Sequence, residues 1–129
     1  MTSAPCVGAV LVVDDEEDTR ELFRDLLEAH GYQVATAEDG VQALAMVSAT
    51  PKICLVILDL LMPNMDGFEV LDRLAADPRG SRLVVWVSTS APDRVPQGIR
   101  CLPKPVDIGR LLALVDEHCV NDAVCEPRP

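Results

Sequence analysis

Short runs of aliphatic residues alternate along the chain with segments whose apolar residues recur at helical spacing. A continuous aliphatic run of this length is typical of a strand that is buried on both faces. The runs predict five strands, at residues 10–13, 32–36, 53–58, 83–87 and 100–102. The periodic segments predict helices at residues 18–30, 39–48, around 68–74 and 108–118. Because strand and helix alternate throughout, we expect an α/β fold with a parallel sheet covered on both faces.

In the first predicted helix, Leu22, Phe23, Leu26 and Leu27 recur at helical spacing. In the second, Val41, Leu44, Ala45 and Val47 are predicted to form the inner face,. Gly31, directly after the first helix, is typical of a C-terminal cap. Trp86 stands inside an aliphatic strand, and we expect it in the core.

The crossover between the fourth and fifth strands is short. Only residues 89–103 separate the fourth strand from Lys104, and three of these residues are prolines. A crossover that contains a helix needs about 10–12 residues at minimum. The fourth crossover helix is therefore predicted to be shortened to a turn or two around residues 93–97.

Composition limits the chain to one domain with an aliphatic core. The chain has 129 residues, of which 49% are hydrophobic and only 3% aromatic,. Its formal net charge of −10 argues against binding to nucleic acid or to an anionic membrane through a general basic surface,. No targeting or membrane-spanning segment is evident, and five cysteines without a CxxC pair favour reduced thiols in the cytoplasm,. Residues 120–129 are expected to form a loose tail.

Charged and polar residues follow the predicted strands at the edge where ligands bind in open parallel sheets. They are Asp14 and Asp15 after the first strand, Asp59 after the third, Ser88 after the fourth and Lys104 after the fifth. Three carboxylates in one crevice repel one another unless a cation lies among them. Oxygen ligands without histidine or cysteine favour a hard cation such as Mg²⁺. A carboxylate can also attack phosphorus and form an aspartyl phosphate.

Simpler interpretations stay open for several acidic residues. Asp14 or Asp15 could serve only as a helix cap, and Asp66-Gly67 could be only a turn and a helix start. The acids at residues 16–18 suit the first turn of a helix, where the helix dipole favours negative charge.

Three separated motifs resemble the receiver domains of two-component response regulators. They are Asp14-Asp15, the D-x-x-M-P-x-M-D-G segment at residues 59–67, and Lys104-Pro105. The resemblance implies a receiver domain over residues 7–119. It also implies a doubly wound, flavodoxin-like sheet of five parallel strands in the order 2-1-3-4-5.

The resemblance also implies roles for individual residues. Asp59 would be the phosphoacceptor, Asp15 would bind Mg²⁺ directly, and Asp14 would hold a metal-bound water. The backbone carbonyl of Leu61 would complete the metal ligands. Lys104 would contact the phosphoryl group, and its bond to Pro105 would be cis.

Two further positions concern the switch that relatives use. Ser88 would be the switch hydroxyl, although Thr89 and Ser90 stay possible. Cys101 stands where relatives carry an aromatic residue that rotates on phosphorylation, and a small thiol cannot fill a pocket as a ring does. The shortened crossover also removes surface that relatives use for dimerisation and output, so we expect that output face to be altered.

By this resemblance, the chain would accept a phosphoryl group from a histidine kinase or a histidine phosphotransfer protein. It would then signal to an unidentified protein by direct contact, as a monomer or weak dimer, without binding nucleic acid by itself. Such a domain is not a turnover enzyme. A degenerate receiver that binds a partner without phosphorylation stays an alternative. An aspartyl-phosphate hydrolase of the haloacid dehalogenase kind fits less well, because Leu61 stands where its general acid would be and no cap segment is present.

Overall fold

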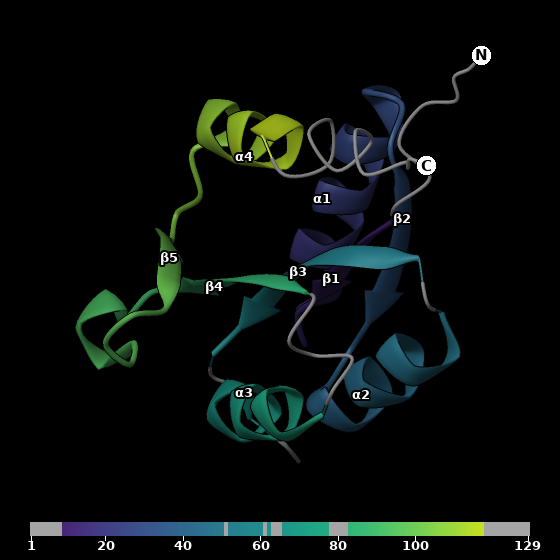
Figure 1. Ribbon diagram of the computed structural model, residues 1–129. Helices are drawn as coiled ribbons and strands as arrows, with labels where there is room; N and C mark the ends of the chain where they lie inside the picture. The colour runs from purple at the N-terminus through teal and green to yellow at the C-terminus, as the bar shows by residue number, and fades with distance from the viewer. Residues whose placement is uncertain (1–8, 51, 61, 63–65, 78–82, 118–129) are drawn as a thin grey trace.

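The computed structural model describes residues 9–50, 52–60, 62, 66–77 and 83–117. Five strands form one parallel sheet in the order β2-β1-β3-β4-β5 (Figure 1). The strands are β1 (Ala9–Val13), β2 (Gln33–Ala37), β3 (Ile53–Asp59), β4 (Val84–Thr89) and β5 (Arg100–Pro103). The α-helices are α1 (Glu17–Ala29), α2 (Gly40–Ala49), α3 (Gly67–Ala76) and α4 (Ile108–Val115). The predicted doubly wound α/β fold and its strand order are confirmed, with element ends that differ from the prediction by a few residues.

The helices cover the sheet from both sides. Helices α1 and α4 lie on one face, and α2 and α3 lie on the other (Figure 1). Within β1, Val10 and Val12 belong to the core on the α1–α4 side, whereas Leu11 and Val13 belong to the core on the α2–α3 side. This alternation explains why the strand is aliphatic at every position, since both of its faces are buried.

The predicted inner face of α2 is partly wrong, and the apolar positions of α1 are not all buried. Leu22 is 50% exposed and Val41 is 56% exposed. In α1 the buried residues are Phe23 and Leu27, one helical turn apart,. In α2 the buried face consists of Gly40, Ala43 and Val47, while Ala45 is exposed. Small side chains at the first two of these positions let α2 lie close to the sheet.

Trp86, expected in the core, is half-buried and packs against the cluster on the α1–α4 side. Among the described residues, no helix has the length and apolar character needed to cross a lipid bilayer.

Polar side chains fix where several helices begin. The carboxylates of Asp39, Asp66 and Asp107 accept hydrogen bonds from the third backbone N–H groups beyond them, at 2.8, 3.1 and 3.2 Å,. Asp66 therefore starts α3, as one of the simpler interpretations proposed. Gly31 follows α1 with a φ of 93°, as the predicted cap requires,. The last helix ends at Val115, and the remainder of its predicted span includes His118, which lies outside the described residues.

The crossover from β4 to β5 contains no α-helix. Its helical part is the single 3₁₀ turn η2 (Pro92–Arg94), slightly before the predicted position. A second turn follows, in which the Ile99 N–H donates to the carbonyl of Pro96 at 3.2 Å. Gly98 has a φ of 89° at the third position of that turn, as a type II turn demands,. The prediction of a shortened crossover helix is thus confirmed, and the helical part is even shorter than predicted.

The two leucine positions of α1 allow a matched test of the packing. Leu27→Ala should lower the free energy of unfolding by about 2–5 kcal/mol, because Leu27 is fully buried and the substitution leaves a cavity,. Leu22→Ala in the same helix should change it by less than about 0.5 kcal/mol. Urea unfolding followed by circular dichroism measures both. Equal losses for the two variants would contradict the assignment of the inner face.

Candidate functional site

Four side chains meet at the carboxyl edge of the sheet because they share one strand phase. Val12, Ile57, Trp86 and Leu102 all face the α1–α4 side. Side chains two positions further along a strand point to the same face. Two residues beyond these four positions stand Asp14, Asp59, Ser88 and Lys104. The strand register places Ser88 directly beside Asp59. The alternation of side chains along the strands thus brings residues that are far apart in sequence to one rim, the carboxyl edge of the sheet.

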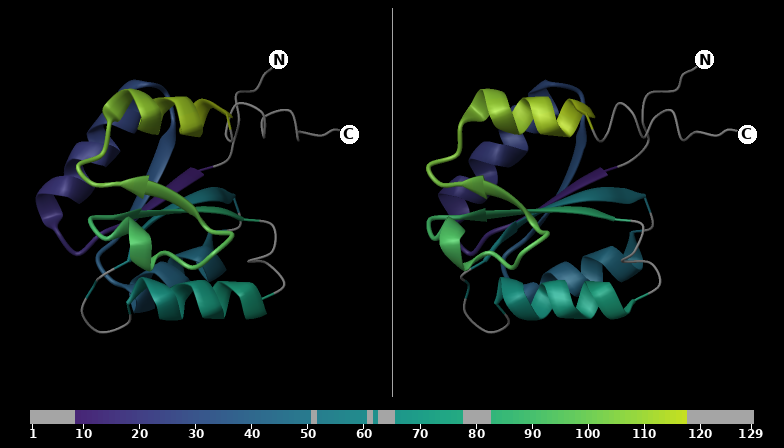
Figure 2. Two further views of the ribbon diagram at one scale, coloured as in Figure 1. Left: turned by 90° about the vertical axis from the view of Figure 1, so that its left-hand side faces the viewer. Right: turned by 60° about the vertical axis from the view of Figure 1, so that its left-hand side comes forward.

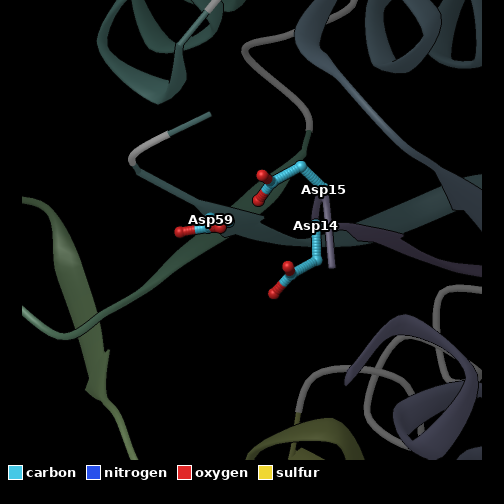
Figure 3. Close-up of side chains that lie close together, drawn as sticks. All are labelled: Asp14, Asp15 and Asp59. Carbon is cyan, nitrogen blue, oxygen red and sulfur yellow. The ribbon is translucent and has the colours of Figure 1, made fainter. Parts of the chain in front are cut away.

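The three carboxylates form a tight cluster. Asp14 and Asp15 follow β1, Asp59 ends β3, and their side chains converge on a shared space (Figure 3). One oxygen from each lies within 4.8 Å of the others. Asp14 and Asp59 are buried, with 2% and 6% of their surface exposed, whereas Asp15 is exposed. Two of the three negative charges therefore have little access to water.

Lys104 is the cation in this cluster. Its Nζ lies 3.2 Å from Asp14 Oδ2 and 3.6 Å from Asp59 Oδ2. Its backbone N–H donates to the Thr89 carbonyl at 2.8 Å, and the Lys104–Pro105 peptide bond is cis. Partial burial by itself would lower the pKa of Lys104, but the nearby Asp14 and Asp59 carboxylates outweigh it, and the pKa is raised,. The ammonium is therefore fully charged at neutral pH.

Asp14 is held by contacts on both of its carboxylate oxygens. Oδ1 accepts a hydrogen bond from the Glu16 N–H at 2.9 Å, and Oδ2 faces Lys104. Arg20 donates to the backbone carbonyl of Asp14 at 2.7 Å, which ties α1 to the end of β1. For Asp15, the structure gives no hydrogen bond or ion pair with any other described residue. Asp15 is thus the acid whose oxygens are most available to an added ligand.

The three candidate hydroxyls after β4 differ in their surroundings. Ser88 is 1% exposed, and its Oγ has no hydrogen-bond partner among the described residues. Thr89 is equally buried, but its Oγ1 accepts a hydrogen bond from the Ala91 N–H at 3.0 Å. Ser90 is exposed. A buried hydroxyl without a partner is costly, by about 1–3 kcal/mol, and marks a place where a ligand atom would be stabilised.

The loop after Asp59 returns closely to the strand. The Gly67 N–H donates to the Leu60 carbonyl at 2.8 Å. A Cβ at Gly67 would lie 2.7 Å from Leu60 Cα and 2.8 Å from the Asp59 carbonyl oxygen. Gly67 thus lets the start of α3 pack on the backbone of the candidate phosphoacceptor. The sequence pattern indicated only a turn at this glycine, and its place one residue before an apolar helix was the available signal.

Two predicted site residues are not among the described side chains of this cluster. Leu61, whose carbonyl was expected to bind the metal, lies outside the described residues. Cys101 lies on β5 opposite Val87 and is half-buried. Burial raises the pKa of its thiol, and Arg110 opposes this in part. At neutral pH the Cys101 side chain is therefore neutral and small, at the position that the resemblance assigns to an aromatic ring in relatives.

The chain belongs to the response regulator receiver domain family, whose model matches residues 10–116. Receiver domains of this family are phosphoacceptor modules of two-component signalling. The fold and the acidic rim described above agree with this membership.

Individual relatives cover most of the chain. It is 35% identical over 119 residues to an uncharacterized 14.6 kDa protein of the sodA1 3′ region of Leptolyngbya boryana, with 86% of this chain and 89% of that protein covered. It is 39% identical over 112 residues to the response regulator MprA of Mycobacterium avium, with 81% of this chain covered. The match covers 47% of MprA, so the chain spans about half the length of that relative.

Solved structures give the same fold. A response regulator receiver protein from Pseudomonas putida superposes with a TM-score of 0.79 at 30% identity, covering 90% of this chain and 99% of that one. The receiver domain of the hybrid histidine kinase CckA gives a TM-score of 0.74 at 33% identity, covering 87% and 99%.

The close approach at Gly67 can be tested by adding one methyl group. Gly67→Ala should lower the free energy of unfolding by about 1–3 kcal/mol, because the new Cβ meets backbone atoms that cannot move aside easily,. Gly109→Ala is the matched control, since its Cβ meets only the Asp107 side chain, at 3.3 Å. The control should stay within about 1 kcal/mol of the wild type. Equal stability of both variants in urea unfolding would argue against a tight contact at Gly67.

Proposed function

We propose that Asp59 accepts a phosphoryl group from the phosphohistidine of a histidine kinase or of a histidine phosphotransfer protein. The observation that carries this proposal is the position of its carboxylate. It is buried, lies 3.6 Å from the Lys104 ammonium, and stands beside an unpartnered Ser88 hydroxyl. A phosphoryl group on Asp59 would find a cation and a hydrogen-bond donor already in place.

The transfer exchanges one bond to phosphorus for another. A carboxylate oxygen of Asp59 attacks phosphorus, the P–N bond to the histidine breaks, and the imidazole nitrogen keeps the electron pair. Lys104 neutralises charge on the phosphoryl oxygens, and the Ser88 O–H donates to one of them. Later attack by water on phosphorus releases inorganic phosphate and restores the Asp59 carboxylate. The chain's own contribution is mainly position and charge.

Mg²⁺ fits the donor set at this rim. Three carboxylates face one ammonium, which leaves an excess negative charge in a partly buried space,. All three offer oxygen, the ligand atom that this ion prefers. Asp15 and Asp59 would bind it directly, Asp14 through a water, and the Leu61 carbonyl would add a ligand. When bound, the ion supplies positive charge to the phosphoryl oxygens.

The phosphorylated domain would signal by contact with another protein, since a phosphoryl group with about two negative charges replaces the single charge of the Asp59 carboxylate beside the loops that follow β3 and β4. The proposal takes residues 7–119 as the receiver, with residues 120–129 as a tail, and places the reaction in the cytoplasm. Each phosphorylation occupies the Asp59 carboxylate until hydrolysis restores it, so the domain is not a turnover enzyme.

The switch would differ from that of relatives. Cys101 takes the place of the usual aromatic residue, and the Ser88 hydroxyl would respond to the phosphoryl group. We also propose that the domain is a monomer or weak dimer and that it does not bind nucleic acid by itself.

Metal binding predicts a stability change that depends on Asp15. Adding MgCl₂ should raise the free energy of unfolding, by about 2.7 kcal/mol at a hundredfold excess over Kd, because the ion binds only the folded cluster. Asp15→Asn should remove most of this gain. Asp18→Asn, an exposed acid in the first turn of α1, should keep it. Thermal unfolding at constant ionic strength, adjusted with KCl, measures the effect, and an equal gain in both variants would refute this metal site.

Phosphorylation can be measured directly by mass. Incubation with acetyl phosphate and Mg²⁺ should add one phosphoryl group to the wild type and none to Asp59→Asn. Asp66→Asn, which removes a negative charge outside the cluster and keeps an oxygen that can cap α3, is the matched control and should still be modified,. Modification of Asp59→Asn at the wild-type level would disprove the assignment. Repeated hydrolysis of p-nitrophenyl phosphate by the wild type would instead favour a hydrolase.

A further inference from the structure

Strand β4 is covered less completely than the other central strands. All five residues of β1 are buried, and β3 is buried except at Cys54. In β4 the first three residues, Val84–Trp86, are only half-buried, and of these Val85 faces the side of α2 and α3. Val85 is incompletely covered because the crossover to β5 places one 3₁₀ turn where a parallel sheet normally receives a covering helix,. Figure 2 shows η2 and α3 on the same side of the sheet, with α1 and α4 on the other side.

This incomplete cover leaves a groove of about 370 Å³ between α3 and the beginnings of β4 and β5. Its lining is mostly apolar and comprises Leu71, Leu74, Ala75, Leu83, Val85, Gly98, Ile99 and Arg100. The carboxylate cluster lies at the opposite ends of the strands. The groove is therefore a separate surface, and what binds there does not need the phosphoacceptor.

The part of the crossover that directly follows β4 contacts the start of α3. The Arg94 guanidinium lies 5.8 Å from the centre of the Phe68 ring, a distance at which a cation and an aromatic face attract each other,. The hydrogen bond from the Ala91 N–H to Thr89 Oγ1 anchors the beginning of the crossover. With both contacts near the carboxyl edge, η2 is held away from the groove, and the groove stays open.

The charge near the groove differs from that of the remaining molecule. Arg100 lines the groove, is exposed, and takes part in none of the ion pairs found among the described residues. Among the described residues, Arg100 is the only charged side chain in the groove's lining, whereas the chain as a whole carries a net charge of −10. A ligand with carboxylates is thus repelled by the molecule as a whole and attracted locally at Arg100.

We propose that this groove binds an amphipathic helix of another protein, with its apolar side chains against α3 and β4 and a carboxylate paired with Arg100. A helix presents apolar residues at i, i+3, i+4 and i+7, which suits a narrow groove between a helix and a strand. A second copy of this chain is a poorer occupant, because two molecules of net charge −10 repel each other,. The partner helix would complete the cover that the short crossover leaves out.

A designed peptide tests the proposal without knowledge of the natural partner. The probe is a fluorescein-labelled helical peptide with leucine at i, i+3, i+4 and i+7 and glutamate along one flank. A second peptide has lysine in place of glutamate, and a third has the same composition with the leucines shuffled. Fluorescence anisotropy with the unphosphorylated wild type and with Asp59→Asn should give equal binding of the glutamate peptide and much weaker binding of the shuffled one. Equal binding to these two proteins separates this test from the phosphorylation test.

Three variants locate the binding surface. Arg100→Glu should weaken binding of the glutamate peptide about tenfold, as expected when a surface attraction becomes a repulsion, and should bind the lysine peptide better than the wild type does. Ile99→Glu should also weaken binding at least about tenfold, because it places a carboxylate in the apolar groove. Leu22→Glu, at an exposed apolar position of α1, should bind as the wild type does. Circular dichroism verifies that each variant is folded.

Two outcomes would overturn the proposal. One is glutamate-peptide binding that is no stronger than that of the shuffled peptide, or that Arg100→Glu and Ile99→Glu leave unchanged. The other is concentration-dependent self-association in sedimentation experiments that Ile99→Glu abolishes, which would assign the groove to a second copy of the chain.

Discussion

The contact of Lys104 with two buried carboxylates is the interaction on which the functional end of this molecule depends. Asp14 and Asp59 lie at the ends of neighbouring strands, where the sheet excludes most water and their repulsion is poorly screened,. One ammonium offsets only part of the charge of three acids. The rim therefore combines a rigid backbone with an electrostatic deficit that an added cation relieves. Removing Lys104 would leave two buried negative charges without compensation, so the fold and the site share this residue.

The same rim shows how stability and reactivity are combined. The strands beneath it are almost entirely aliphatic and buried, which fixes the positions of the residues that follow them. The polar groups themselves are not all satisfied: Ser88 carries a buried hydroxyl that finds no partner among the described residues. Proteins tolerate such unfavourable features where a ligand later compensates them. The packing of the strands below the rim offsets this cost, since Leu55, Val56 and Leu58 of β3 are fully buried.

Much of this arrangement could be predicted from the sequence, because strands buried on both faces are recognised by composition alone. The residues at the strand ends, Asp14, Asp59, Ser88 and Lys104, follow from those strands and from the rule that ligands bind at the carboxyl edge. The helical faces were harder, since α2 packs through Gly40 and Ala43 and exposes the larger Val41. Apolar spacing indicates a face only when the largest residues are the buried ones. Strand phase favoured Ser88 over Thr89, but the hydrogen bond that occupies the Thr89 hydroxyl depends on the local backbone turn and was not predicted. The close contact at Gly67 could not be predicted either, because it depends on where the backbone of Asp59 and Leu60 lies.

The shared phase of the strands also sets what kind of sequence change the domain tolerates. Substitution at one position alters one side chain, but the loss of a single residue within β3 would turn every later side chain of that strand to the opposite face. Asp59 would then point toward α2 and α3, away from Lys104, although its identity was unchanged. Length within the strands is therefore a functional property in its own right, whereas the crossovers are free to shorten, as the segment between β4 and β5 has done.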